Sequence, residues 1–195
     1  LRGIMGYEGH AMALADGAQR TQVARESMAL LCEVAERLRA DGLPVEVVSA
    51  GGTCTYDVTG TTPGVNELQA GTYVLMDRNY GRYGIGFTEA LRCLTTLVSR
   101  QGPLAALDAG FKALAVDHGN PELPDDVAAK ILFLSDEHSS LAIGDGFPFH
   151  PGDRLWLRPA HLDPTVNLHD RLYAVRGDEV VDIWPVARGY PPPSA

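Results

Sequence analysis

The chain has 195 residues, of which 45% are hydrophobic and 21% are charged, and its formal net charge is -9. This acidic balance, with Lys112 and Lys130 as the only lysines, argues against a nucleic-acid or anionic-membrane surface, because no basic run exists to neutralise phosphates. Three cysteines without C-x-x-C spacing, and the lack of an apolar run of about 18 residues, indicate a cytoplasmic protein whose partners are small molecules.

The first half of the chain alternates strands with helical segments. Strands are predicted over residues 1–5, 44–49 and 72–77, a long amphipathic helix over 19–40, and a brief helical turn over 65–69. Leu1 already reads as the inside of a strand, which suggests a fragment. The alternation is typical of a parallel α/β protein, in which ligand groups lie at the C-terminal ends of the strands.

Past residue 86 the pattern changes to short strand-like runs separated by Gly, Pro and Asp. These runs cover residues 90–100, 105–114, 128–134, 139–143, 154–158, 171–175 and 179–183. They predict an antiparallel β domain over 86–190, a small barrel or sandwich, after an α/β part over 1–85. Three consecutive prolines near the C-terminus predict that the tail over 191–195 is extended or disordered.

A histidine and an aspartate two positions apart, His161 and Asp163, form the main candidate metal motif. On an extended backbone both side chains point to one side, so that an imidazole nitrogen and a carboxylate oxygen can reach one cation. Only two protein ligands would leave positions for water or substrate, as in a catalytic site. Pro159 and Pro164 restrict the backbone on both sides. The alternative interpretation is a surface His and Asp in a loop.

Polar residues follow three of the predicted strands, over 7–10, 51–55 and 77–80. The Gly-Gly-Thr-Cys-Thr segment over 51–55 offers unobstructed backbone N–H groups and two hydroxyls, which are donors suited to a phosphate. A tight turn that needs small residues explains this segment about as well.

Six segments together resemble the D-threonine aldolase and D-serine dehydratase-like family. They are GYEGH (6–10), SAGGTCT (49–55), NELQAGTYVLMDRNY (66–80), LDAGFK (107–112), LSDEH (134–138) and PAHLDPTVNL (159–168). The resemblance implies the alanine-racemase-like, fold-type III architecture, a (β/α)8 barrel that binds pyridoxal 5'-phosphate followed by an antiparallel β domain. Residues 1–85 would be the last βα units of an incomplete barrel, and residues 86–190 the β domain with the metal pair.

The resemblance also implies roles for individual residues. The cofactor phosphate would be held by Gly51, Gly52, Thr53 and Thr55; Tyr7 and His10 would lie beside the pyridine ring; His161 and Asp163 would bind the metal; and Asp77, Tyr80 and His138 would line the active site. Alternatives stay open: Asp77 as a strand-end cap, His138 as a hydrogen-bonded turn residue, Tyr7 as packing. Glu137 would either orient the His138 ring or be a solvated charge.

The implied reaction is the cleavage of D-threonine or another β-hydroxy-D-amino acid to glycine and an aldehyde, in a homodimer. Within the family, His-x-Asp is the aldolase version of the motif and binds a divalent ion, with Mn²⁺ expected ahead of Zn²⁺ or Mg²⁺, whereas dehydratases tend to hold zinc with His-x-Cys. Neither Lys112 nor Lys130 matches the lysine that carries the cofactor, so we expect this chain alone to be inactive. The alternatives are a D-serine or 3-hydroxyaspartate dehydratase and a non-catalytic metal-binding fragment.

Overall fold

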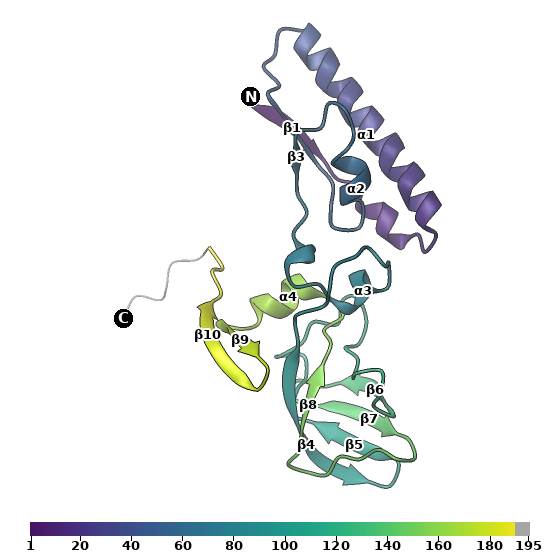
Figure 1. Ribbon diagram of the computed structural model, residues 1–195, viewed down its shortest axis with the longest axis vertical. Coiled ribbons are helices and arrows are strands. Elements are labelled where there is room, and N and C mark those ends of the chain that lie inside the picture. The colour runs from purple at the N-terminus through teal and green to yellow at the C-terminus, as the bar shows by residue number, and fades with distance from the viewer. Residues whose placement is uncertain (190–195) are drawn as a thin grey trace. The chain divides into compact units, whose positions relative to one another are not determined.

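The computed structural model describes residues 1–189 and divides them into two compact units. The first unit comprises residues 1–76 and 80–88, and the second comprises 77–79 together with the chain from residue 89 onward. Each is described by itself below and can be followed by colour in Figure 1. The tail predicted over 191–195 lies outside the described residues.

The first unit is built on a small parallel sheet in the order β1-β2-β3. Its elements are β1 (Gly3–Gly6), the 3-10 helix η1 (Gly9–Ala13), α1 (Gly17–Ala40), β2 (Val47–Ala50), α2 (Tyr56–Thr59), β3 (Glu67–Leu68) and the 3-10 helix η2 (Thr72–Val74). The short helix α3 (Arg78–Gly81) lies where the chain passes between the units. The predicted parallel α/β arrangement of this half is therefore present as three strands, which do not close into a barrel within the described residues.

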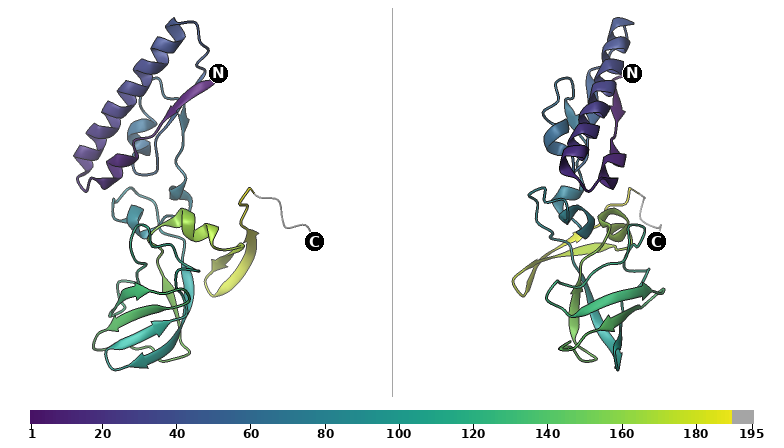
Figure 2. Two further views of the ribbon diagram at one scale, coloured as in Figure 1. Left: turned by 180° about the vertical axis from the view of Figure 1, so that it is seen from behind. Right: turned by 90° about the vertical axis from the view of Figure 1, so that its right-hand side faces the viewer.

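Helix α1 covers one face of this sheet, as Figure 2 shows. It begins where the side chain of Asp16 accepts a hydrogen bond from the backbone N–H of Gln19 at 2.8 Å, which is N-terminal capping. Ala35 of the helix and Val48 of β2 are fully buried in the core between them. The helix carries charged side chains along its length, and no helix among residues 1–189 is both long and apolar enough to cross a membrane.

Two predictions for residues 65–77 are wrong. The expected helical turn over 65–69 contains strand β3, because the Asn66 side chain accepts a hydrogen bond from the Val48 N–H and donates one to the Glu46 carbonyl, which holds this segment beside β2. The expected strand over 72–77 contains η2, because the Met76 N–H turns back to the Thr72 carbonyl at 2.7 Å.

The second unit contains a curled five-stranded antiparallel sheet in the order β6-β7-β5-β4-β8 and a separate β9-β10 hairpin. Its elements are β4 (Cys93–Gln101), β5 (Leu104–Leu107), β6 (Ala129–Leu134), β7 (Ser139–Ile143), β8 (Arg154–Leu157), α4 (Leu162–Asn167), β9 (Arg171–Arg176) and β10 (Glu179–Pro185). Strands β6 and β8 end the order, so the sheet is a half-barrel. The largest core cluster among the described residues belongs to this unit, and in it Leu97, Leu107, Leu141 and Leu157 are fully buried.

The predicted strand over 105–114 is too long, because the chain leaves the sheet after Leu107 and turns at Gly110. The Gly110 carbonyl accepts hydrogen bonds from the N–H groups of Ala113 and Leu114, both at 3.0 Å, which closes a helical turn. A Cβ at Gly110 would lie 2.2 Å from the Ser135 carbonyl oxygen, so only glycine fits against the β6–β7 turn. The chain then continues into the segment over 113–118, in which the Ala115 N–H bonds to Thr165 of α4.

Candidate metal centre and cofactor loop

His161 and Asp163 lie at the beginning of helix α4, and both belong to the second unit. His161 is the N-cap, with extended backbone angles of φ -138° and ψ 120°, whereas Asp163 is in the first helical turn. The expectation that both sit on extended backbone is therefore wrong. Pro164 is the reason, because proline fits the first turn of a helix, and an acidic residue there is favoured by the helix dipole.

The two side chains nevertheless approach each other across the turn, with His161 Nε2 at 3.5 Å from Asp163 Oδ2. Two ligand atoms each about 2.1 Å from one cation stand about 3.0 Å apart at right angles and about 3.4 Å apart at the tetrahedral angle. The observed separation thus fits a shared divalent ion. His161 is mostly buried, with 19% of its side chain exposed, whereas 72% of the Asp163 side chain is exposed.

Asp77, predicted to line the site, holds the backbone between these two residues. Its Oδ2 accepts a hydrogen bond from the Leu162 N–H at 2.9 Å, and the residue is 2% exposed. A buried carboxylate at the N-terminus of α4 satisfies one of the N–H groups that the helix leaves unpaired. Asp77 therefore acts as a cap, although on α4 rather than at a strand end.

Helix α4 is also tied to the segment over 113–118. The buried Thr165 hydroxyl donates to the His161 carbonyl at 2.7 Å and accepts from the Ala115 N–H at 3.2 Å. Nε2 of His169 donates to the Ala113 carbonyl at 2.9 Å. These bonds fix the next residues of that segment, Asp117 and His118, beside the start of the helix.

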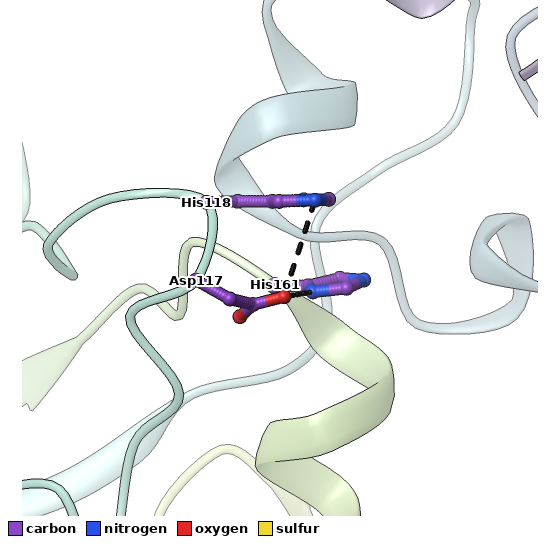
Figure 3. Close-up of side chains that lie close together, drawn as sticks. All are labelled: Asp117, His118 and His161. Atoms are coloured by element: carbon purple, nitrogen blue, oxygen red, sulfur yellow. Dashed lines mark hydrogen bonds and ion pairs between the residues drawn. The ribbon is translucent and has the colours of Figure 1, made fainter. Parts of the chain in front are cut away.

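Asp117, His118 and His161 form a cluster that sequence analysis missed, drawn in Figure 3. Asp117 Oδ2 lies 2.6 Å from His161 Nδ1, and the rings of His118 and His161 stack with centroids 3.9 Å apart and an interplanar angle of 12°. Burial favours a higher pKa for the Asp117 carboxyl, but the hydrogen bond from His161 and the nearby imidazoles outweigh it and lower that pKa. The sequence signal that could have indicated this cluster is the adjacency of Asp117 and His118.

The stacking of His118 excludes it as a ligand to an ion bound in the plane of the His161 ring. Imidazole lone pairs lie in the ring plane, and the two planes are nearly parallel. An ion at His161 Nε2 therefore lies off the plane of the His118 ring, where His118 has no lone pair to offer. Among these three residues only His161 is placed to bind an ion next to Asp163.

The loop after β2, predicted to hold a phosphate, lies in the first unit and is buried over residues 51–55. Gly51 has φ +81°, which favours glycine, and a Cβ there would lie 2.8 Å from Thr59 Cγ2. A Cβ on Gly52 would lie 2.8 Å from Cε2 of the Tyr7 ring. The structure thus brings two predicted cofactor residues, Tyr7 and Gly52, into contact.

The two threonine hydroxyls of this loop already have partners. Thr53 Oγ accepts a hydrogen bond from the Tyr73 N–H at 3.1 Å, so its own proton is still available for donation. The Thr55 hydroxyl donates to Oε1 of Glu8, a carboxylate that is 1% exposed and also accepts from Thr59 at 2.9 Å. The N–H groups of Gly52 and Thr55 also donate within the loop, to the Thr55 hydroxyl at 3.4 Å and to the Gly52 carbonyl at 3.2 Å. The donors that fit a phosphate are therefore the Thr53 hydroxyl and the other loop N–H groups, without the Thr55 hydroxyl.

The remaining predicted residues divide between the units. In the first unit, His10 is exposed in η1, and the hydroxyls of Tyr7 and Tyr80 both reach Met12 Sδ, at 3.6 and 2.9 Å. Burial raises the pKa of the Tyr80 hydroxyl above its ordinary value, and the nearby Tyr7 raises it further.

In the second unit, His138 is exposed in the β6–β7 turn and is not part of the cluster around His161. Glu137 beside it pairs with Lys112 at 2.5 Å, which leaves the solvated-charge interpretation in place of an orienting role. Lys130 lies in β6.

Comparison with known proteins places this geometry in context. Residues 90–175 match the family model described as "Putative serine dehydratase domain". A 3-hydroxy-D-aspartate aldolase from Paracoccus denitrificans (strain Pd 1222) is 37% identical over 199 residues, covering 96% of this chain and 51% of that enzyme. The chain therefore spans about half the length of this curated relative.

Solved structures agree with these matches. The crystal structure of D-threonine aldolase from Filomicrobium marinum superposes with a TM-score of 0.90 at 33% identity, covering 97% of this chain and 54% of that one. A variant of D-threo-3-hydroxyaspartate dehydratase, solved in the metal-free form, gives a TM-score of 0.82 at 28% identity, covering 95% of this chain and 55% of that one.

Proposed function

Since the chain belongs to the D-threonine aldolase and D-serine dehydratase-like family, we propose that the complete protein is a lyase dependent on pyridoxal phosphate and a divalent metal. It cleaves D-threonine or a related β-hydroxy-D-amino acid to glycine and an aldehyde. The aldolases among the similar proteins support this reaction. The complete enzyme acts as a homodimer.

The observation that carries the proposal is the 3.5 Å separation between His161 Nε2 and Asp163 Oδ2. His161 supplies a neutral nitrogen ligand and Asp163 a negatively charged oxygen ligand, and the positions that they leave open accept water or substrate. A divalent ion held there, Mn²⁺ in the first instance, supplies a Lewis acid that lowers the pKa of a bound hydroxyl. Asp77 keeps the Leu162 backbone, and with it both ligands, in place.

The cofactor groups proposed in the first unit are Tyr7 and His10 beside the ring, with Gly51, Gly52 and Thr53 at the phosphate. Pyridoxal phosphate, when bound, supplies an electron sink for charge at the substrate Cα. Contact between the Tyr7 ring and Gly52 supports a common role for these two residues. Thr55 acts indirectly, since its hydroxyl binds Glu8 and holds the loop.

The test replaces Asp163 by Ala in the complete protein. We expect bound Mn²⁺ and D-threonine cleavage both to be lost, with the metal measured by elemental analysis and the cleavage by glycine formation. Asp145→Ala, an exposed carboxylate in the turn after β7, is the matched control and should retain both. Unchanged metal content and cleavage in Asp163→Ala would refute the proposal.

A dehydratase acting on D-serine or 3-hydroxyaspartate is the second candidate, favoured by the match to D-threo-3-hydroxyaspartate dehydratase. Product analysis separates the two reactions. An aldolase releases glycine and an aldehyde, whereas a dehydratase releases ammonia and a keto acid. Incubation of the complete protein with D-threonine and with 3-hydroxy-D-aspartate, followed by assays for glycine and ammonia, decides between them.

A further inference from the structure

We propose that Asp117 is a positioning residue that fixes the tautomer and orientation of His161, so that the Nε2 lone pair faces Asp163. The inference rests on the proposed role of His161 as a metal ligand. Asp117 is 44 positions from His161 in the chain, and its carboxylate oxygen reaches the far nitrogen of the ring at 2.6 Å. It acts through His161 and does not itself touch the ion.

The distance between Asp117 and His161 indicates a hydrogen bond, and not two ligands that bind the same ion. Oδ2 of Asp117 and Nδ1 of His161 at 2.6 Å are closer than the roughly 3.0 Å or more expected for two ligands at right angles or wider on one cation. A short contact of this kind is typical of a charge-assisted hydrogen bond. Asp163 Oδ2, at 3.5 Å from Nε2, has the spacing of a fellow ligand. The two carboxylates thus have different roles toward one imidazole.

The hydrogen bond decides which nitrogen can bind an ion. A carboxylate oxygen accepts, so Nδ1 of His161 must carry the proton, and in a neutral imidazole Nε2 then carries the lone pair. A carboxylate behind a ligating histidine also increases the basicity of the ligand and fixes the ring orientation. Nε2 is therefore the ring nitrogen of His161 that is available to a metal ion, even before an ion binds.

The surrounding structure holds Asp117 in position. Its segment is fastened to α4 two residues earlier, where the Ala115 N–H donates to Thr165 Oγ at 3.2 Å. His118, the next residue, lies flat against the His161 ring with centroids 3.9 Å apart and limits its rotation. Figure 3 shows this arrangement, with Asp117 approaching the edge of the ring and His118 covering its face.

The test compares Asp117→Ala and Asp117→Asn with the unaltered complete protein. Binding of Mn²⁺ alone is followed by the electron paramagnetic resonance signal of the free ion. We expect the dissociation constant to rise about 10- to 100-fold in Asp117→Ala, the range for loss of an outer-shell partner. The dissociation constant of Asp117→Asn should lie between those of the unaltered protein and Asp117→Ala, because an amide oxygen still accepts from Nδ1–H but carries no charge. Asp145→Ala should bind like the unaltered protein.

A second readout distinguishes positioning from a merely structural role. In metal-free protein, the ¹⁵N shifts of the His161 ring report which nitrogen is protonated. We expect the Nδ1–H tautomer in the unaltered protein and a shift toward Nε2–H in Asp117→Ala, with the thermal unfolding midpoint changed little. If the alanine variant does not fold, the same comparison is made between Asp117→Asn and the unaltered protein.

The outcomes separate this inference from the proposed function. If His161→Ala leaves Mn²⁺ binding unchanged, His161 is not a ligand and the proposed metal centre fails. If His161→Ala abolishes binding while both Asp117 variants bind normally and keep the Nδ1–H tautomer, the metal centre stands and the positioning role is overturned. Weakened binding with a lowered unfolding midpoint and an unchanged tautomer would also overturn it.

Discussion

Asp77 accepts a hydrogen bond from the backbone N–H of Leu162, the residue between the two proposed metal ligands, at 2.9 Å. Because Asp77 is buried, its removal leaves that N–H without a partner in a place that water reaches poorly. We expect Asp77→Ala to lower the free energy of unfolding by about 1–2 kcal/mol, as for loss of a strong helix cap, and to weaken Mn²⁺ binding. Urea unfolding of the metal-free protein and Mn²⁺ titration measure the two effects.

Asp77→Asn is the matched variant, because its side-chain oxygen can still accept from the Leu162 N–H. It should recover most of the stability lost in the alanine variant. If Asn and Ala at this position destabilise the protein equally, the cap on α4 is not what Asp77 contributes.

Thr165 links α4 to the segment that carries Asp117. Thr165→Val keeps the shape of the side chain but leaves the Ala115 N–H and the His161 carbonyl without the hydroxyl. We expect a loss of about 1–3 kcal/mol in the free energy of unfolding, the range for an unsatisfied buried polar group. Thr165→Ser should restore much of it, and equal stability of the Val and Ser variants would contradict the link.

Gly110 allows the turn after β5 to approach the β6–β7 turn. A methyl group there would lie 2.2 Å from the Ser135 carbonyl oxygen, so the backbone must move. We expect Gly110→Ala to cost about 1–3 kcal/mol in thermal or urea unfolding, as for overpacking elsewhere. Gly144→Ala is the control, since its Cβ would meet Ala128 at an ordinary 3.4 Å. A similar effect at both positions would show that the close approach is not the cause.

The ion pair of Glu89 with Arg158 predicts a pH dependence of stability in the second unit. The two side chains are joined by two hydrogen bonds of 2.7 and 2.8 Å. These bonds lower the pKa of Glu89, ahead of burial, which opposes them. A lowered folded-state pKa means that the stabilisation is fully present above the unfolded value, about 4.3, and is lost as the pH falls through the folded value below it.

Glu89→Gln should therefore be less stable than the unaltered protein at pH 7, with the difference shrinking below about pH 4. Urea midpoints measured from pH 7 to pH 3 test this, with Glu179→Gln on exposed strand β10 as the control. A difference between Glu89→Gln and the unaltered protein that stays constant over this range would rule out ionisation of Glu89 as the source.

The elements that sequence analysis predicted best are those with a clear local pattern. Strand β7 over Ser139–Ile143 was predicted with its observed bounds, and α1 within two residues at its beginning, because alternation and helical periodicity are local signals. The proximity of His161 and Asp163 was also predicted, although the backbone there is a helix start. The two side chains meet because His161, as the N-cap, keeps extended backbone angles while Asp163 lies in the first helical turn.

The errors have a common physical origin in contacts distant along the chain. The run over 72–77 has the composition of a strand but folds back on Thr72, while Glu67 and Leu68 pair with β2 under the guidance of Asn66. Asp117 meets His161 in a segment that Thr165 holds against α4. No periodic pattern in the sequence predicts a contact between residues 44 positions apart.

Asp163 is exposed beside a mostly buried, hydrogen-bonded His161, so the two proposed donors differ in how far the surrounding fold constrains them. A substitution at Asp163 changes the hardness of one donor atom while the nitrogen donor stays where the fold holds it. An oxygen there suits harder ions such as Mn²⁺ or Mg²⁺, and a sulfur would suit softer ones such as Zn²⁺. A single substitution at Asp163 would therefore be enough to change the metal preference of the proposed centre without a change in the fold around it.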